Sequence, residues 1–184
     1  MAEVLFVCTG NLCRSPSAAA LLRARFAHEG PHDITVHSAG TMQARGGPPE
    51  ALLLEAEAFG LDLYDHVPRQ VAPEDLAQAD LVVAMTRQHL RELMLVAPDT
   101  LTRSFTLREL VRRAESVGPR PRDEALEAWL TRVRGNRRQL DVLGESAADD
   151  VADPMGGPAT GYRAMLNQVA RLTDALYALG WGAG

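Results

Sequence analysis

The stretch that decides the fold is residues 4–22, which read VLFVCTGNLCRSPSAAALL. The apolar run at its start predicts a short buried strand over Glu3–Val7, and the residues from Ser15 onward predict a helix. Between the two lies a cysteine followed, after five residues, by an arginine (Cys8 and Arg14). A loop that runs from a strand into a helix N-terminus gathers backbone N–H groups at the positive end of the helix dipole. The stretch therefore predicts a loop that binds a tetrahedral oxyanion.

The residue types inside this loop fit that interpretation. Gly10 allows the backbone to turn where a side chain would clash, and Asn11 is among the few residue types that tolerate a positive φ. Arg14 can offer two parallel N–H donors to phosphate oxygens. Cys8, at the base of the loop, would act as a thiolate nucleophile, favoured by the helix end, Arg14 and the Ser15 hydroxyl. The alternative, a buried cysteine beside a solvated arginine, does not explain why all these features occur in register.

Residues 7–16 resemble the signature loop of the low-molecular-weight protein tyrosine phosphatases. Protein arginine phosphatases and thioredoxin-coupled arsenate reductases share this fold and loop. Four further segments are similar to the family: 36–41, 65–70, 79–85 and 105–109. One departure is Thr86, where the family usually has Asp. The resemblance covers roughly residues 3–110 and 148–180, and it implies a single phosphatase domain over residues 1–184.

Strand-like and helix-like segments alternate along the chain. Strands are predicted at 3–7, 34–37, 79–84 and 102–107, a turn at 38–41, and helices at 15–29 (closed by Gly30 and Pro31), 48–59, 86–96, 107–116 and 162–179. Such alternation indicates an α/β fold with ligands bound at the carboxyl ends of parallel strands. We expect a three-layer sandwich, in which a four-stranded parallel sheet carries helices on both faces.

The overall composition is that of an ordinary globular protein. The 184 residues are 46% hydrophobic and 23% charged, enough for one domain with its own core. The net charge of −5 argues against a nucleic-acid partner. Neither a signal peptide nor an apolar run of membrane-spanning length is visible, so we expect a cytoplasmic protein with free thiols and no membrane insertion. All 19 basic residues are Arg, which indicates a GC-rich, bacterial coding sequence.

The segment at about 117–148 is predicted to be a helical insertion relative to the family's usual length. It opens with the helix-breaking sequence GPRPR at residues 118–122. An apolar stripe follows at Leu126, Trp129, Leu130 and Val133, and then a basic cluster at Arg132, Arg134, Arg137 and Arg138. Two interpretations stay open: a surface helix that packs its tryptophan and leaves its arginines solvated, or a lid or docking site for an acidic partner.

A proton donor is predicted at Asp153, which precedes Pro154. The proline favours an extended conformation at Asp153 and helps to project its carboxyl group, although Asp-Pro pairs are also common at simple turns. Asp149 and Asp150 lack a following proline and are expected to be solvated. The resemblance implies a catalytic set of Cys8, Arg14 and Asp153.

In the implied mechanism Cys8 attacks phosphorus, Asp153 protonates the leaving oxygen, and water hydrolyses the phosphocysteine. The remaining loop residues would bind the substrate phosphate or hold the loop: Thr9, Gly10, Asn11, Leu12, Cys13 and Ser15. Two cysteines alone do not make a metal site, so neither a metal nor another cofactor is expected. Cys13 would either trap an oxidised Cys8 as a reversible disulfide or pack as a small buried thiol.

The substrate class is less well defined by the sequence. An arsenate reductase would need further cysteines after Cys13, and the chain has none. The family's tyrosine enzymes usually carry a bulky aliphatic residue at the position of Leu12, where arginine phosphatases carry Thr. Met155 and Gly156 replace the aromatic residues that usually follow Asp-Pro in tyrosine enzymes. The aromatic wall is therefore either missing or supplied elsewhere, with Trp129 as a candidate. We expect a phosphorylated protein or a small aryl phosphate as substrate, with a non-catalytic phosphoprotein-binding module as the rival interpretation.

Overall fold

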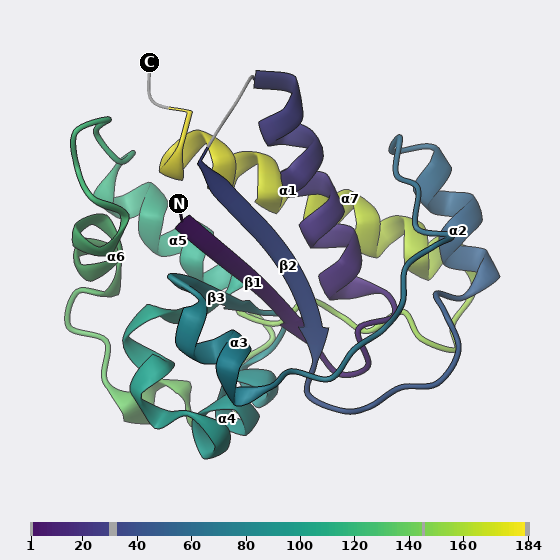
Figure 1. The fold of residues 1–184 in the computed structure, drawn as a ribbon, viewed down its shortest axis with the longest axis horizontal. Coiled ribbons are helices and arrows are strands. Elements are labelled where there is room, and N and C mark those ends of the chain that lie inside the picture. Colours follow the sequence, from purple (N-terminus) through teal and green to yellow (C-terminus); the bar gives the residue numbers. More distant parts are fainter. Residues whose placement is uncertain (1, 30–32, 145, 183–184) are drawn as a thin grey trace.

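A computed structural model of the chain describes residues 2–29, 33–144 and 146–182. Its centre is a parallel sheet in the order β2-β1-β3-β4. The strands are β1 (Ala2–Cys8), β2 (Ile34–Gly40), β3 (Leu81–Ala84) and β4 (Ser104–Thr106). All three strand pairings are parallel, with β1 between β2 and β3 (Figure 1). The predicted four-stranded parallel sheet is confirmed.

Helices connect and cover the strands. They are α1 (Arg14–Glu29), α2 (Glu50–Glu57), α3 (Pro73–Gln78), α4 (Arg87–Val96), α5 (Leu107–Val117), α6 (Leu126–Arg134) and α7 (Ala159–Gly180), with short 3₁₀ helices η1 (Pro98–Arg103) and η2 (Gln139–Val142). The side chains of Thr86 and Thr106 accept the backbone N–H groups of His89 and Glu109, which fixes where α4 and α5 begin. None of the helices in the described part of the chain is both long and apolar enough to cross a membrane.

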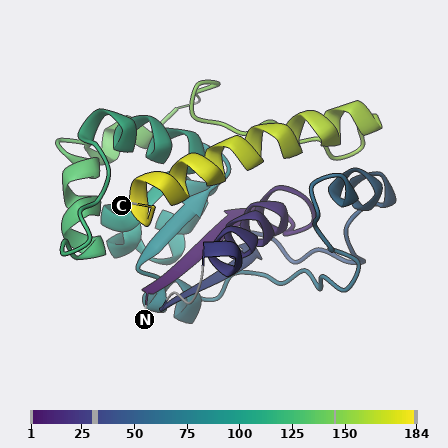
Figure 2. The same ribbon diagram turned by 90° about the horizontal axis from the view of Figure 1, so that it is seen from above.

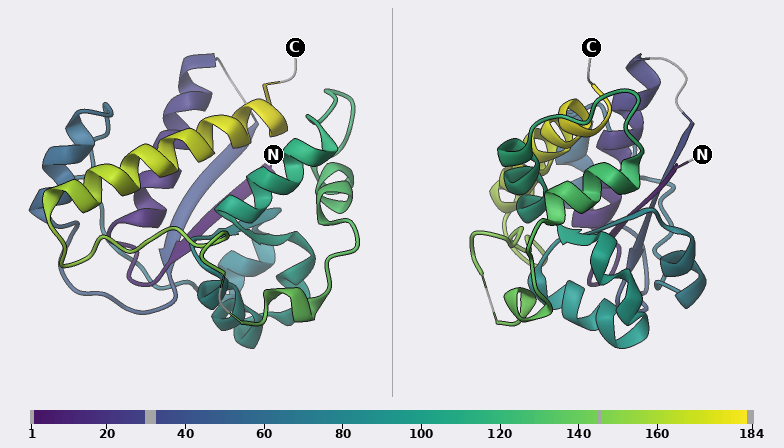
Figure 3. Two further views of the ribbon diagram at one scale, coloured as in Figure 1. Left: turned by 180° about the vertical axis from the view of Figure 1, so that it is seen from behind. Right: turned by 90° about the vertical axis from the view of Figure 1, so that its left-hand side faces the viewer.

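The sheet separates two apolar layers, as the period of a strand requires. Alternate β1 residues, Val4, Phe6 and Cys8, pack in one core cluster with side chains of α1, α5 and α7. Leu5 and Val7 point the other way, into a smaller cluster beside α3 and α4. Figure 3 shows the sheet between these two groups of helices, and Figure 2 shows α7 running alongside α1. The predicted three-layer sandwich is confirmed.

Some predicted boundaries differ from the structure. The turn expected at 38–41 is wrong, because β2 continues through Gly40, with Ser38 paired to Phe6 and Gly40 to Cys8. The third and fourth strands are shorter than expected, the fourth because η1 occupies residues 98–103, and α3 was not predicted at all. The predicted helix at 48–59 is shorter, since Pro49 stands at its N-cap. The predicted stop of α1 at Gly30 and Pro31 lies outside the described residues.

The segment at 117–148 folds onto the rest of the chain. Trp129 is fully buried, and its indole Nε1 donates to the Gly118 carbonyl at 3.2 Å. Leu130 and Val133 join it in the same core cluster as β1 and α7, so the apolar stripe packs inward. The expectation that all its arginines are solvated is wrong, because the buried Arg137 side chain pairs with Glu109 and donates to two backbone carbonyls.

Candidate active site

The loop between β1 and α1 is held in its curl by Asn11. This residue has a φ of 54°, as its side-chain type predicts, and it is completely buried. Its amide nitrogen donates to Ser15 Oγ at 3.0 Å and to Ser38 Oγ at 2.9 Å. Its side-chain oxygen accepts the Arg69 N–H at 3.2 Å. One side chain thus ties the loop to its own helix, to the end of β2 and to the connection between α2 and α3.

Glycine is required where β2 approaches this loop. A Cβ added at Gly40 would lie 2.6 Å from the Thr9 carbonyl oxygen and 2.9 Å from the Asn11 nitrogen. Neither atom can move without distorting the loop backbone, so the close approach excludes any side chain at this position. A bulkier residue at Gly40 would displace the loop that carries the cysteine.

Cys8 lies at the carboxyl end of β1 and is almost fully buried. Its sulfur is 3.0 Å from the Ser15 hydroxyl oxygen. That hydroxyl has one proton, which it can give either to Cys8 Sγ or to the Ala39 carbonyl at 3.2 Å. An ionised sulfur would attract this proton, so Ser15 is placed to stabilise a thiolate.

Arg14 joins the loop to the segment before α7. Its side chain is 5% exposed and forms an ion pair of 2.7 Å with Asp153 Oδ2. The same nitrogen, Nη2, donates to Thr9 Oγ1 at 3.2 Å, and Nη1 donates to the Val151 carbonyl at 3.3 Å. Asp153 is 47% exposed, so its carboxyl group stands at the rim of the site while Arg14 lies in its wall.

These groups line one cavity of about 200 Å³. Its lining contains all three predicted catalytic residues and most of the predicted binding residues, namely Cys8, Thr9, Gly10, Leu12, Cys13, Arg14 and Asp153, together with Met155. Asn11 and Ser15 are buried and hold the loop. Among the described residues that line this cavity none is aromatic. Trp129 is packed inside the core, so the idea that it forms the aromatic wall is wrong.

Comparison with known proteins identifies the family. The sequence model of the low molecular weight phosphotyrosine protein phosphatases matches residues 3–120, well over half of the chain. The chain belongs to this family. The sequence resemblance is thereby confirmed, and the matched residues include the loop of Cys8 and Arg14.

Relatives of two substrate classes are similar to this phosphatase. A low molecular weight protein-tyrosine-phosphatase of Streptomyces coelicolor is 44% identical over 102 residues, which are 52% of this chain and only 60% of that relative. A protein-arginine-phosphatase of Bacillus subtilis is 36% identical over 109 residues, 59% of this chain and 72% of the relative. The crystal structure of a YwlE mutant from Bacillus subtilis superimposes with a TM-score of 0.72 at 26% identity, covering 96% of each chain.

The expectation of a solvated side chain is wrong for Asp149, whereas Asp150 is half-buried. Asp149 is 1% exposed and forms ion pairs with Arg87 and Arg112. These arginines hold the pKa of the Asp149 carboxyl below its usual range, in spite of the burial that acts to raise it. Asp150 Oδ1 accepts the Arg87 N–H at 2.8 Å, at the start of α4. Both residues anchor the segment that leads to Asp153.

Sequence reasoning also missed two residues that support the loop of this phosphatase. Ser38 Oγ accepts a hydrogen bond from the Asn11 side-chain amide, and His66 Nε2 lies 2.8 Å from the Asn11 carbonyl oxygen. Burial lowers the pKa of His66, which keeps the ring neutral. Both residues lie in the segments that resemble the family, at 36–41 and 65–70, so the resemblance itself carried a signal for them.

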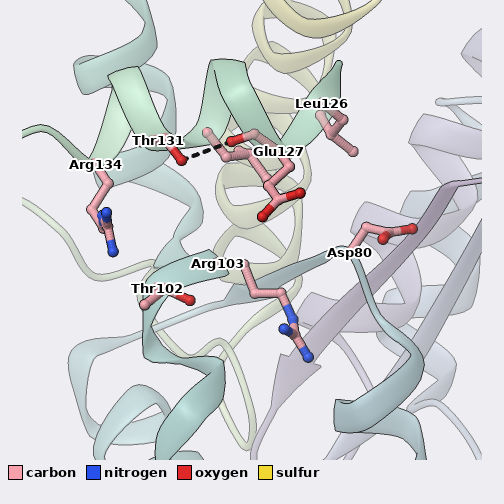
Figure 4. Close-up of a pocket in the computed structure, with 8 residues that line it drawn as sticks. Asp80, Thr102, Arg103, Leu126, Glu127, Thr131 and Arg134 are labelled. Atoms are coloured by element: carbon pink, nitrogen blue, oxygen red, sulfur yellow. Dashed lines mark hydrogen bonds between the residues drawn. The ribbon is translucent and has the colours of Figure 1, made fainter.

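A second cavity, of about 430 Å³, lies between α6 and the segment of η1 that precedes β4. Figure 4 shows charged side chains of both signs around it: Asp80, Glu127, Arg103 and Arg134. It contains neither cysteine, and its mixed charges give no preference for a phosphate dianion. The cavity above Cys8 is therefore the candidate active site.

Proposed function

We propose that this phosphatase hydrolyses protein phosphotyrosine through a phosphocysteine intermediate, with Cys8, Arg14 and Asp153 as its catalytic residues. One observation carries the proposal: the Cys8 sulfur, the Arg14 guanidinium and the Asp153 carboxyl group all line a cavity of about 200 Å³ at the N-terminus of α1. A nucleophile, a phosphate ligand and a proton donor are the groups that this reaction requires.

The phosphate would bind to the loop backbone and to Arg14. Among the described residues, none provides an acceptor for the backbone N–H groups of residues 9–13. Polar backbone groups in such a partly buried loop require a partner, and a phosphate dianion in the cavity can supply it. Arg14 would exchange its contact with Asp153 for one with a phosphate oxygen, which frees the Asp153 carboxyl group to face the leaving oxygen.

The chemical steps follow from this placement. The Cys8 thiolate attacks phosphorus while the bond to the leaving oxygen breaks, and Asp153 gives its proton to that oxygen. Arg14 and the loop amides stabilise the charge on the transferred phosphoryl group. Asp153, now ionised, then takes a proton from the water that hydrolyses the phosphocysteine, which restores the thiolate and releases inorganic phosphate.

A turnover assay tests the proposal against a binding-only module on the same fold. The enzyme should release p-nitrophenol from para-nitrophenyl phosphate with saturation kinetics, and inorganic phosphate should inhibit competitively. Binding alone requires neither a nucleophile nor a proton donor. Phosphate binding without any turnover would therefore refute the catalytic proposal and favour the binding module.

The cavity lining supports phosphotyrosine as the substrate. Leu12 and Met155 give the slot above the phosphate apolar walls, which suit a phenyl ring and provide no partner for a guanidinium group. Protein arginine phosphatase is the second candidate, because relatives of both kinds are similar to this chain and none of the described lining residues is aromatic. A comparison of kcat/KM on phosphotyrosine and phosphoarginine peptides separates the two.

Leu12→Thr should lower the preference for phosphotyrosine over phosphoarginine. The change removes an apolar contact with the phenyl ring and adds a hydroxyl that can meet a guanidinium N–H. We expect the ratio of the two kcat/KM values to fall by about 1–3 kcal/mol in free-energy terms. Leu54→Thr, at an exposed leucine on α2, is the matched control and should leave the ratio unchanged. A wild type that prefers phosphoarginine, or a Leu12→Thr ratio equal to that of wild type, contradicts the tyrosine assignment.

Cys13 is the proposed partner of Cys8 under oxidation. Burial, and next the negative charge of Cys8, raises the pKa of Cys13 to about 12, so this thiol is protonated during turnover. Peroxide converts the Cys8 thiolate to a sulfenic acid, which removes that charge, and attack by Cys13 then forms a disulfide and releases water. Both cysteines are free thiols in the structure and line the same cavity.

Peroxide should therefore inactivate the wild type in a way that dithiothreitol reverses, whereas the inactivation of Cys13→Ser should be harder to reverse. Trypsin cuts after Arg14 but nowhere between the two cysteines, so a disulfide would appear within one peptide that is lighter by two hydrogens and resists alkylation. An oxidised wild type without that peptide would leave Cys13 with a packing role alone.

We also propose that the segment at 117–148 is an insertion within a single domain and that the protein is cytoplasmic. The first proposal is supported by Trp129 and Leu130, which share one core cluster with β1, α1 and α7. The second is supported by the two free cysteines, which are typical of reducing compartments.

A further inference from the structure

His89, on α4, is a buried histidine that the hydrolytic steps above do not use. Only 3% of the residue is exposed. Its Nε2 lies 2.9 Å from Thr9 Oγ1, in the loop above the cysteine, and its Nδ1 lies 2.9 Å from Thr86 Oγ1, at the start of its own helix. The ring therefore bridges α4 and the phosphate loop, two elements that lie far apart in the sequence.

The ring is uncharged at neutral pH. Burial, and next the positive charge of Arg14, lowers the pKa of His89 to about 4. A neutral imidazole has one donor and one acceptor nitrogen. Two proton assignments fit these distances: the Thr9 hydroxyl donates to His89 Nε2 while His89 Nδ1 donates to Thr86 Oγ1, or both bonds run the other way. Arg14 Nη2 donates to Thr9 Oγ1 in either case. In both assignments the Thr9 hydroxyl is bonded to the His89 ring and to Arg14 at once, so His89 fixes the position of the oxygen that accepts from Arg14.

We propose that His89 is a positioning residue that, through the Thr9 hydroxyl, holds the Arg14 guanidinium in the orientation that binds phosphate. This role rests on the proposed function, because it concerns the same phosphate site. Arg14 has three described partners: the Val151 carbonyl, the Thr9 hydroxyl and the Asp153 carboxylate.

The Thr9 contact matters most once phosphate is bound. Arg14 Nη2 contacts both Thr9 and Asp153, and the proposed mechanism breaks the contact with Asp153. The guanidinium plane is then fixed by the Val151 carbonyl on one nitrogen and the Thr9 hydroxyl on the other. Without the second contact the group can rotate, and two-oxygen binding of phosphate, which depends on the fixed fork of the guanidinium, weakens.

Two substitutions of His89 by amide residues distinguish positioning of Arg14 through Thr9 from a role limited to stabilising the start of α4. Glutamine places its side-chain amide near the position of the histidine Nε2 and can reach Thr9. Asparagine is shorter, places its amide near the position of Nδ1, and can reach only Thr86. If His89 acts through Thr9, His89→Gln should restore function and His89→Asn should not; if His89 only stabilises the start of α4, the reverse should hold.

The readout is the Kd of inorganic phosphate for the otherwise unchanged chain, measured by calorimetry, together with kcat and KM on para-nitrophenyl phosphate. We expect His89→Ala and His89→Asn to raise this Kd by about 10-fold, the scale of a lost hydrogen bond to a charged group, and to raise KM with it. We expect His89→Gln to stay within about threefold of the wild type. A purely structural role would lower the Tm and the active fraction while the phosphate Kd of the folded protein stayed the same.

A double-variant cycle with Thr9 tests whether the two residues act in one chain. Thr9→Val removes the hydroxyl, and Thr9→Ser keeps it and serves as the control. The double variant Thr9→Val, His89→Ala should bind phosphate no more weakly than Thr9→Val alone. Additive losses, rescue by asparagine, or an unchanged Kd in all His89 variants would overturn the positioning role while leaving the phosphatase proposal intact. A wild type that neither binds phosphate nor turns over substrate would overturn the proposed function, and the positioning role with it.

Discussion

Cys8→Ser should abolish turnover while leaving phosphate binding intact. At neutral pH an alcohol in this loop stays protonated and cannot replace a thiolate as the nucleophile. We expect kcat to fall to background, a loss that can reach about 10⁶-fold when the nucleophile of a covalent enzyme is removed. The measurement is kcat on para-nitrophenyl phosphate, with the Kd of inorganic phosphate from calorimetry as the control for an intact site.

The structure explains why the two effects should separate. Cys8 is almost fully buried, and a serine hydroxyl is smaller than a thiol and can hydrogen-bond to Ser15 Oγ, which lies 3.0 Å from the Cys8 sulfur. The phosphate ligands, Arg14 and the loop amides, do not depend on the sulfur. A Cys8→Ser enzyme that keeps more than about 1% of the wild-type kcat would rule out a phosphocysteine, because another group would then be transferring the phosphate.

The sequence predicted the part of the site whose functional residues lie close together along the chain. Four such residues lie within eight consecutive positions: Cys8, Asn11, Arg14 and Ser15. An oxyanion loop needs a nucleophile, a turn and a phosphate ligand, and each of these can be recognised from the residue type at its position. The positive φ of Asn11 is a property of that residue in that turn. Asp153 lies far along the chain from this loop. It could be predicted as the proton donor only because a proline follows it and because the family has an Asp-Pro pair at this position.

The residues that were missed or misread depend on partners far along the chain. Asp149 looks like a solvated turn residue, but it meets Arg87 and Arg112, which are 62 and 37 residues away. No local pattern distinguishes it from Asp150. His89 lies 80 residues from Thr9, and its spacing in α4 is that of any buried helix position. Burial and pairing of this kind are decided by tertiary packing, which a single sequence does not display.

The same limit explains the errors in secondary structure. Residues 38–40 read as a turn because they are small, yet they extend β2, because each has a backbone partner in β1. Trp129 is a candidate for the substrate slot only because Met155 and Gly156 replace the expected aromatic residues there. The fully buried indole instead fills space beside Gly180, where an added Cβ would lie 3.7 Å from the ring. Both cases show tertiary contacts overriding a local or compositional inference.

Asp153→Asn should slow the hydrolysis of phosphotyrosine peptides by roughly 10²–10⁴-fold, the usual contribution of a general acid. The amide cannot give a proton to the leaving oxygen. The effect of the substitution should shrink for leaving groups that depart easily without a proton. The loss of kcat/KM on para-nitrophenyl phosphate should therefore be clearly smaller than the loss on phenyl phosphate. The measurement is kcat/KM across a series of aryl phosphates of increasing leaving-group pKa, for wild type and variant.

Asp150→Asn is the matched control, because it makes the same chemical change three residues away. Asp150 Oδ1 accepts the Arg87 N–H at the start of α4, and an asparagine oxygen can accept it too, so this variant should keep its activity. Loss of stability should not confuse the result, since the Asp153 side chain is 47% exposed and an ion pair at such a site contributes little to folding.

If Asp153→Asn slows the reaction of all leaving groups equally, or if Asp150→Asn is the slower variant, the proton comes from another group. Asp153 would then have a single remaining role: its carboxylate would hold the Arg14 guanidinium until phosphate takes its place.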